Sequence, residues 1–430
     1  MQYRIWPVLV LLLLAAPAYS QEDEWAMDDW GEEAAPESPF SGFVELALGA
    51  RLRSDPAIST DKTLADLRAQ LQWDRDFEHS RLKLTADLYY DGVLDQTRMQ
   101  IRELAWQGSL ASFGKWGEQF DVKVGQQVLT WGTGDYVFLN DLFPKDFQSF
   151  FAGRDDDYLK APSLSAKVSG FFDWANVDFV VTPEFTPDNY INGDYFSFFS
   201  PFAGVNVAPG FDVTPPLRPQ NPEYAMRIYK SMGAVEYALY GYRGFHKSPS
   251  SFTAFGEPRF SELAVYGASA ITTFASGLLN AEVAYYDSLE DKSGNDPLVP
   301  NSQTRWLLGY EQELIKNLTG SAQVYVERTL DYDALQTASL NTAFEPNKNR
   351  VVFTQRLMYR ALQQTLTLNL FNFYSTSDED GYLKINADYS PVDQWQLSAG
   401  VNLFYGDQPF SFFNQFADAS NAFVRFKYYY

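Results

Sequence analysis

The chain has 430 residues, of which 17% are aromatic and none is cysteine, and its formal net charge at pH 7 is −22. The lack of cysteine excludes disulfides, thiol nucleophiles, cysteine-based zinc sites and an acylated lipoprotein N-terminus. So negative a charge argues against nucleic-acid binding, which requires a basic surface. The mean hydropathy is slightly negative, which is typical of a membrane β-barrel and not of a helical membrane protein.

The first twenty residues have the features of an export signal. Arg4 supplies the basic start, residues 8–14 form a short apolar run, and Ala18-Tyr19-Ser20 is a small-residue cleavage site before Gln21. We therefore expect a signal peptide over residues 1–20. No later segment has the roughly 18 consecutive apolar residues of a membrane-spanning helix.

Residues 21–38 are acidic, contain no basic residue and include Trp25 and Trp30. Acidic runs of this kind seldom pack into a fold. We expect a periplasmic N-terminal arm, and the alternative is a docking peptide anchored by its two tryptophans.

From residue 39 onward the chain alternates between apolar and polar residues. Leu46 and Leu48 oppose Glu45 and Arg51, for example, with the two-residue period of a strand. Segments of about ten such residues predict an all-β, single antiparallel transmembrane β-barrel over residues 39–430. The eighteen candidate strands are residues 41–53, 63–74, 80–90, 97–108, 118–131, 163–172, 175–183, 222–231, 233–243, 259–272, 276–287, 302–314, 317–328, 349–360, 364–374, 381–389, 393–406 and 420–430.

The connections between these strands alternate in length. Short ones follow the even strands, and long ones follow most odd strands, as at 132–162, 184–221, 288–301, 329–348 and 407–419. Short periplasmic turns and long extracellular loops are how outer-membrane barrels are built. An even number of strands also places both ends of the barrel in the periplasm.

The chain closes on an aromatic strand in which Val424, Phe426, Tyr428 and Tyr430 share one face. This strand resembles the C-terminal strand that the barrel-assembly machinery of Gram-negative bacteria recognises. An ordinary exposed edge strand of this composition would invite aggregation. We therefore expect an outer-membrane location, in contact with lipid and lipopolysaccharide.

The alternation also predicts which charged residues face the lumen. The first six strands and the last one supply mostly bases, and closure brings them onto one wall: Arg51, Arg68, Arg81, Lys83, Arg98, Lys123, Lys167, Arg425 and Lys427. The ninth to thirteenth strands supply mostly acids: Glu236, Glu262, Glu282, Glu311 and Glu327. Walls of opposite sign would focus a field across the pore. The alternative is that these charges pair with neighbours and only hydrate the interior.

Three loops carry clusters of phenylalanine, at 147–151, 196–202 and 410–416, and these include Phe150, Phe198 and Phe412. Loops exposed to water do not need so many aromatic rings. We expect the clusters to pack on one another as a cap or an inward constriction. The alternative is an apolar site that admits a hydrophobic solute or lipid.

A strand that ends in Trp131-Gly132 leads into Asp135, Asn140-Asp141 and Pro144-Lys145-Asp146-Phe147. This run of about thirty residues resembles a poorly characterised family of Gram-negative outer-membrane barrels, which accompany RND-type exporters and are distantly similar to alginate-export and porin barrels. The chain departs from the family's Asn-Pro-Arg-Asp pattern, because Leu142-Phe143 precede Pro144 and a lysine replaces the usual arginine. The resemblance implies a barrel and an export partner in the periplasm or the inner membrane.

The only two histidines, His79 and His246, are predicted at opposite ends of the barrel, and no phosphate-binding loop or metal-ligand spacing is present. We therefore predict no cofactor, no metal and no catalytic residue. The expected function is a porin-like channel for small or charged solutes, with a charge-lined lumen narrowed by extracellular loops. The alternatives are a conduit for lipid or hydrophobic compounds that works with an RND-type exporter, and a hydrolase at the rim around His246.

Overall fold

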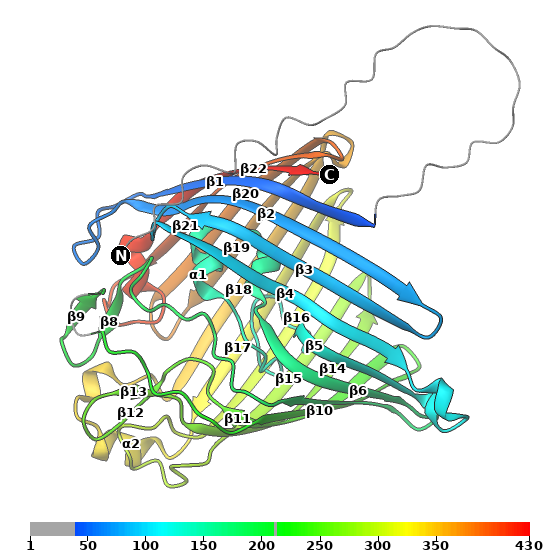
Figure 1. The fold of residues 1–430 in the computed structure, drawn as a ribbon. Helices are drawn as coiled ribbons and strands as arrows, with labels where there is room; N and C mark the ends of the chain where they lie inside the picture. Colours follow the sequence, from blue (N-terminus) through cyan, green and yellow to red (C-terminus); the bar gives the residue numbers. More distant parts are fainter. Residues whose placement is uncertain (1–38, 210–212) are drawn as a thin grey trace, which may run out of the picture. The chain divides into compact units, whose positions relative to one another are not determined.

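The computed structural model describes residues 39–209 and 213–430. The predicted signal peptide and acidic arm lie outside the described residues. Eighteen strands form one antiparallel sheet, and pairing of the first strand with the last closes it into a barrel (Figure 1). The predicted fold class is confirmed.

The barrel strands follow the predicted ranges closely. Their bounds are β1 (Phe40–Arg51), β2 (Lys62–Phe77), β3 (Ser80–Asp91), β4 (Gln96–Ser109), β5 (Phe120–Val128), β6 (Pro162–Phe171), β7 (Asn176–Thr182), β10 (Glu223–Met232), β11 (Val235–Phe245), β14 (Glu262–Phe274), β15 (Gly277–Ser288), β16 (Gln303–Ile315), β17 (Leu318–Thr329), β18 (Asn349–Ala361), β19 (Leu366–Ser375), β20 (Asp380–Val392), β21 (Trp395–Gly406) and β22 (Asn421–Tyr429).

The long connections carry the small elements. These are α1 (Phe147–Ala152), α2 (Tyr332–Ala338) and two hairpins, β8 (Phe198–Ser200) with β9 (Val205–Val207) and β12 (Ser251–Phe252) with β13 (Pro258–Arg259). Among the described residues, no helix is long and apolar enough to cross a membrane.

The two ends of the barrel differ. At one, the short-turn end, two-residue turns such as Glu78-His79 join strands, and Gly42 and Tyr430 exchange backbone hydrogen bonds where the described chain begins and ends. At the other, the long-loop end, lie α2 and both hairpins, on the left of Figure 1. Three connections break the alternation: residues 110–119 form a longer excursion at the short-turn end, and residues 92–95 and 376–379 are tight turns at the long-loop end.

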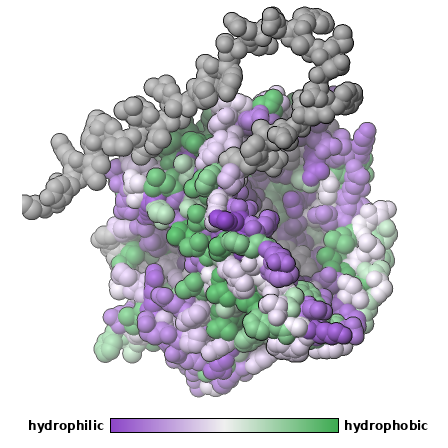
Figure 2. All heavy atoms as spheres, turned by 45° about the vertical axis from the view of Figure 1, so that its right-hand side comes forward, coloured by the Kyte–Doolittle hydropathy of each residue, from purple (hydrophilic) through white to green (hydrophobic). Residues whose placement is uncertain are grey.

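The strands separate apolar from polar side chains as predicted. On β1, Leu46 is 48% exposed on the outer face, whereas Glu45 is 1% exposed and points into the barrel. Figure 2 shows hydrophobic side chains on the visible surface of the molecule, interspersed with hydrophilic ones. Because β1 pairs with β22, the sheet has no open edge, so every strand has neighbours for its backbone hydrogen bonds. Such complete backbone pairing is required in the hydrocarbon core of a membrane, which offers no hydrogen-bonding partners.

A barrel of this many strands is too wide for the side chains of its wall to fill. The connection between β5 and β6, residues 129–161, instead folds into the lumen, and Figure 1 shows its helix α1 inside the ring of strands. We call this segment the inward loop.

The outer face generates a prediction about stability. Leu357 lies on the outer face in the middle of β18 and is 41% exposed. Leu357→Arg should lower the free energy of unfolding from lipid vesicles by about 2–4 kcal/mol, because lipid solvates a cation poorly near the bilayer midplane. The measurement is a urea titration of the refolded protein in vesicles.

The matched control is Gln100→Arg, which places the same cation on the inner face opposite Asp87. This variant should unfold at nearly the wild-type urea concentration. An equal decrease in the free energy of unfolding for the two variants would mean that Leu357 does not face lipid.

Candidate functional site

The first residues of the inward loop are hydrogen-bonded to the opposite wall of the barrel. Gly132 has φ 87°, a left-handed conformation, and turns the following backbone towards Glu282 of β15. Oε1 of Glu282 accepts hydrogen bonds from N and Oγ1 of Thr133 and from N of Gly134 (3.0 Å), and Oε2 accepts from Nδ2 of Asn140 (2.7 Å). The glycine of the Trp-Gly pair therefore lets one buried wall carboxylate hold the start of the loop.

A second contact ties the loop to β17 and β18. Asp135 forms an ion pair with Arg356 (3.3 Å) and accepts a hydrogen bond from Ser321 (3.1 Å). Further along the loop, Asp156 pairs with Lys384 of β20. Both carboxylates thus bind cations on strands far away in the sequence.

A third contact fixes the end of the loop to the wall where the barrel closes. Asp155 pairs with Arg425 (3.0 Å) and Lys427 (2.8 Å) of β22, and both bases also lie near Glu45 of β1 (3.5 and 3.7 Å). Burial by itself would raise the pKa of Asp155, but the two cations outweigh it and hold that pKa well below its ordinary value. The preceding Arg154 pairs with Asp66 of β2 at 2.6 Å.

The predicted Pro-Lys-Asp run shapes the loop itself. Asp141 binds Nζ of Lys145 (2.9 Å) and Oγ1 of Thr130 (2.8 Å). The carbonyl of Pro144 accepts a bond from the backbone of Ala161 (3.0 Å), which holds the two arms of the loop together. Asp146 caps α1 by accepting from N of Ser149 at 2.7 Å.

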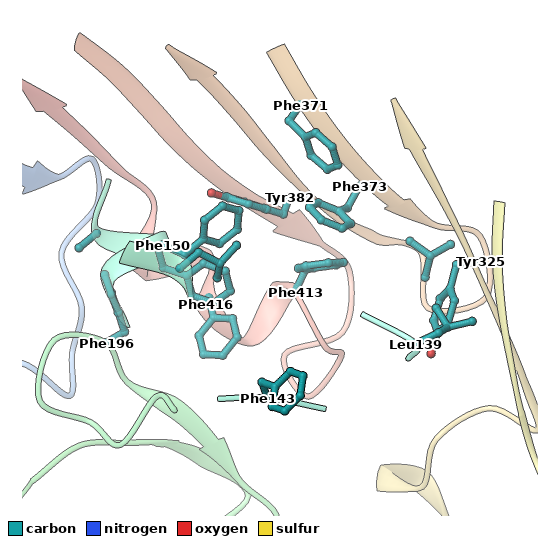
Figure 3. Close-up of a cluster of buried hydrophobic side chains, with 14 of the residues drawn as sticks. Leu139, Phe143, Phe150, Phe196, Tyr325, Phe371, Phe373, Tyr382, Phe413 and Phe416 are labelled. Atoms are coloured by element: carbon teal, nitrogen blue, oxygen red, sulfur yellow. The ribbon is translucent and has the colours of Figure 1, made fainter. Parts of the chain in front are cut away.

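Aromatic rings cover the loop on the long-loop side. Phe150 and Phe151 of α1 pack against Tyr382 of the wall, with ring centroids 5.7 and 5.5 Å apart. Phe151 also meets Phe196 (6.5 Å) and Phe416 (5.3 Å) from the two other phenylalanine-rich loops. Figure 3 shows these rings converging from α1, the loops and the strands. The prediction that the three clusters pack on one another is confirmed.

The inward loop separates two cavities. The long-loop chamber, of about 1550 Å³, is lined by the loop and by residues of the other long connections, including Phe202, Phe252, Phe344 and Phe412. The short-turn chamber, of about 710 Å³, is lined by residues 41–43, Arg102 and the run Asp155–Tyr158. Residues of the inward loop therefore line both cavities.

Most of the predicted lumen bases have an acidic partner on or near their own wall. These pairs are Arg51–Asp55 (4.0 Å), Arg68–Asp87 (2.7 Å), Arg81–Asp76 (2.5 Å), Lys83–Glu103 (3.0 Å), Lys123–Glu103 (2.5 Å), Lys167–Asp178 (3.7 Å) and the pairs of Arg425 and Lys427. Arg98 instead binds the amide oxygen of Gln96 at 3.1 Å. Pairing neutralises much of the charge separation that we expected between the walls.

The predicted acids lie in different environments. Glu236 pairs with Arg227 at 2.8 Å, Glu282 binds the inward loop, and Glu311 faces the lumen near the short-turn end, opposite Ser321. Glu262 is a correction, because it does not face the lumen. In β14 it shares the outer face with Tyr266 and lies 3.6 Å from the exposed Arg243.

Two of the remaining predicted loop residues pack against the buried aromatic cluster, and one does not. Trp131 packs edge-on against Phe143 (4.9 Å) beneath the long-loop chamber. Phe198 lies in β8 against the aromatic core. Phe412 remains 52% exposed and lines the chamber instead of joining the buried rings.

Several residues that hold the loop were not singled out in the sequence. The main ones are Asp66, Arg102, Arg154, Arg356 and Lys384. Asp66 lies two residues before the predicted inward residue Arg68, so the alternation could have identified it. The partners across the lumen could not be found in this way, because nothing in the local sequence pairs Arg154 with Asp66.

The two histidines lie at opposite ends, as predicted. His79 is exposed in the turn between β2 and β3, beside Glu78 (3.7 Å). His246 follows β11 at the long-loop end, and its Nε2 is buried with no hydrogen-bond partner among the described residues. Burial lowers the pKa of His246 to about 4, and Arg305 adds to the shift.

No family model matches the sequence, and no curated protein matches it either. The fold does resemble solved outer-membrane porins of the Occ family. OccAB3 of Acinetobacter baumannii is 10% identical, with a TM-score of 0.54 over 91% of this chain and 98% of that one. OccK5 of Pseudomonas aeruginosa is 10% identical, with a TM-score of 0.53 over 91% and 96%. At this identity the likeness shows a shared barrel fold.

The pKa of Asp155 generates a prediction about pH. A depressed carboxyl pKa stabilises the native loop fully above the ordinary aspartate pKa of about 3.9, and this stabilisation is lost as the pH falls further. Amide hydrogen exchange over residues 147–161 should therefore show protection at pH 5 that declines progressively below about pH 4. Asp155→Asn should reduce this protection already at pH 5, because it leaves two buried cations with fewer partners.

Asp157→Asn is the matched control, since the Asp157 carboxylate is exposed and forms no ion pair with the described residues. It should exchange like the wild type after correction for intrinsic rates. Equal protection of residues 147–161 in the Asp155→Asn and Asp157→Asn variants would show that the Asp155 ion pairs do not hold the loop.

Proposed function

We propose that the protein is a porin-like outer-membrane channel, with the long-loop end outside the cell and the short-turn end in the periplasm. The observation that carries this proposal is a closed barrel that is apolar outside and polar inside, with cavities on both sides of a single inward loop. A water-filled lumen interrupted in this way supports diffusion of small solutes. The inward loop is the proposed constriction.

The proposed solutes are small or charged. Charged side chains line the lumen, but most are paired, so we propose a hydrated wall with a weak preference for one sign of ion. The inward loop would then select chiefly by size.

The remaining parts of the proposal concern location and partners. Residues 1–20 would direct export, the acidic arm 21–38 would stay in the periplasm, and β22 would be recognised by the barrel-assembly machinery. The outer face would contact lipid and lipopolysaccharide. An accompanying RND-type exporter, and a link to alginate-export barrels, are proposed from the resemblance of residues 131–147.

A conduit for hydrophobic compounds is the second candidate. It is favoured by the exposed rings that line the long-loop chamber, such as Phe202 and Phe412. For the hydrolase at the rim, no described residue is hydrogen-bonded to Nε2 of His246, so the geometry lends it no support.

Recording in planar lipid bilayers tests the channel. The wild type should give small, discrete conductance steps, because the inward loop narrows the lumen. A variant with Asp135→Asn, Asp155→Asn and Glu282→Gln should give steps several-fold larger, because the loop loses three of its wall contacts.

The control variant carries Asp157→Asn and Glu311→Gln, two lumen carboxylates that do not hold the loop. Its steps should match those of the wild type. A correctly folded wild-type protein that gives no discrete steps would refute the channel, and equal steps in the two variants would refute the constriction.

The ion selectivity of the channel tests whether permeating ions pass the ion-paired side chains of the lumen wall. Arg81 and Lys83 lie towards the short-turn end, where they pair with Asp76 and Glu103. Arg81→Glu together with Lys83→Glu replaces two cations with carboxylates beside Asp76 and Glu103, so the reversal potential in a KCl gradient should shift towards cation selectivity. An unchanged reversal potential would mean that permeating ions do not pass this wall.

A further inference from the structure

The long-loop chamber is lined by aromatic rings from several different connections. Phe199, Phe344 and Phe410 form a triangle with centroid distances of 5.1, 5.3 and 6.1 Å. Phe202 packs edge-on against Phe252 at 5.0 Å. All five rings line the same cavity. Their convergence from separate loops makes an aromatic surface that no single sequence segment contains.

Two of the rings at this surface remain open to the cavity. Phe202 is 54% exposed and Phe412 is 52% exposed, although both lie at the chamber and not on the lipid-facing strands. An exposed aromatic ring keeps unfavourable contact with water that an apolar ligand would remove.

The cations that line the chamber are almost all neutralised by the protein. Lys145 pairs with Asp141 (2.9 Å), Lys247 with Glu223 (2.6 Å), Arg305 with Glu327 (3.3 Å) and Arg350 with Asp378 (2.7 Å). His246 is uncharged near neutral pH, because its pKa is lowered to about 4. Arg218 is the exception, and it is exposed to solvent. An anionic ligand would therefore find no free buried charge here.

One donor at the aromatic surface is unused. Arg350 lies over the ring of Phe412, with Cζ 4.5 Å from the centroid, and its Nε binds Asp378. Its Nη2 is buried and has no hydrogen-bond partner among the described residues. A buried donor without a partner is costly, so an acceptor placed here would be bound favourably.

From these observations we infer that the long-loop chamber binds an uncharged aromatic or alicyclic solute that carries a single hydrogen-bond acceptor. The apolar part lies on Phe412 and the phenylalanine triangle, and the acceptor accepts a hydrogen bond from Nη2 of Arg350. This inference rests on the proposed channel for its biological use, since it names the class of solute that the chamber captures before passage.

Three naphthalene probes test the inference by equilibrium dialysis of the protein in lipid nanodiscs against empty nanodiscs. 2-Acetonaphthone is neutral and has an acceptor, 2-methylnaphthalene is neutral without one, and 2-naphthoate is an anion. We expect saturable binding of 2-acetonaphthone, with each of the other two probes bound about tenfold more weakly.

Variants locate the site. Phe412→Ala should weaken binding of 2-acetonaphthone about tenfold, because it removes an apolar contact. Arg350→Lys keeps the charge beside Asp378 but removes Nη2, so this variant should bind 2-acetonaphthone no better than 2-methylnaphthalene. Phe255→Ala is the control: Phe255 is 93% exposed at the same end of the barrel but does not line the chamber, and its loss should change nothing.

Binding no stronger than to empty nanodiscs would overturn the inference, as would tighter binding of 2-naphthoate or wild-type binding by Phe412→Ala. Conductance measured on the same preparations separates the two proposals. Discrete steps without 2-acetonaphthone binding would overturn the solute site alone, and saturable binding without steps would overturn the channel alone.

Discussion

The width of the barrel is the constraint on which the rest of the structure depends. Eighteen tilted strands enclose a space that wall side chains cannot fill, so the interior must hold water or another part of the chain. In this protein, residues 129–161 enter that space and reach walls on nearly all sides through Glu282, Arg356, Arg425 and Asp66. The interior is therefore organised by charged contacts to one segment, together with the buried aromatic cluster that packs on it.

This organisation explains why so many charges are buried in a chain of net charge −22. A buried charge is tolerated when it has a partner and further hydrogen bonds, and removing one partner is costly. Asp155 between Arg425 and Lys427, and Glu282 among loop amides, meet both conditions. Phenylalanine rings then cover the loop on one side, where Phe151 joins three connections through a single ring.

The fold could be predicted from the sequence because each strand carries its own signal. The alternation of apolar and polar residues located all eighteen strands, and the lengths of most connections agreed with this number. Errors occurred where this signal weakens near a strand end. At Glu262 the alternation was assigned to the wrong face, and the structure shows that its partner is the exposed Arg243.

The site was predicted less completely, because its contacts join residues far apart in the sequence. The Trp-Gly pair and the phenylalanine cluster at 147–151 lie in the inward loop, and both can be recognised from the local sequence. The wall residues that bind the loop cannot be recognised from the local sequence. Arg356, for example, lies 221 residues from its partner Asp135. The degree of charge pairing in the lumen could not be read from alternation alone, which gives the face of each residue and not its neighbour.

The most direct test of the central claim is disulfide trapping of the inward loop against the wall in lipid. The chain contains no cysteine, so Asp135→Cys and Ser321→Cys introduce a unique pair at positions whose side-chain oxygens lie 3.1 Å apart. Mass spectrometry after mild oxidation should find the two residues cross-linked in high yield. Two free thiols that both react with an added maleimide, and no cross-link, would show that the loop does not lie inside the barrel.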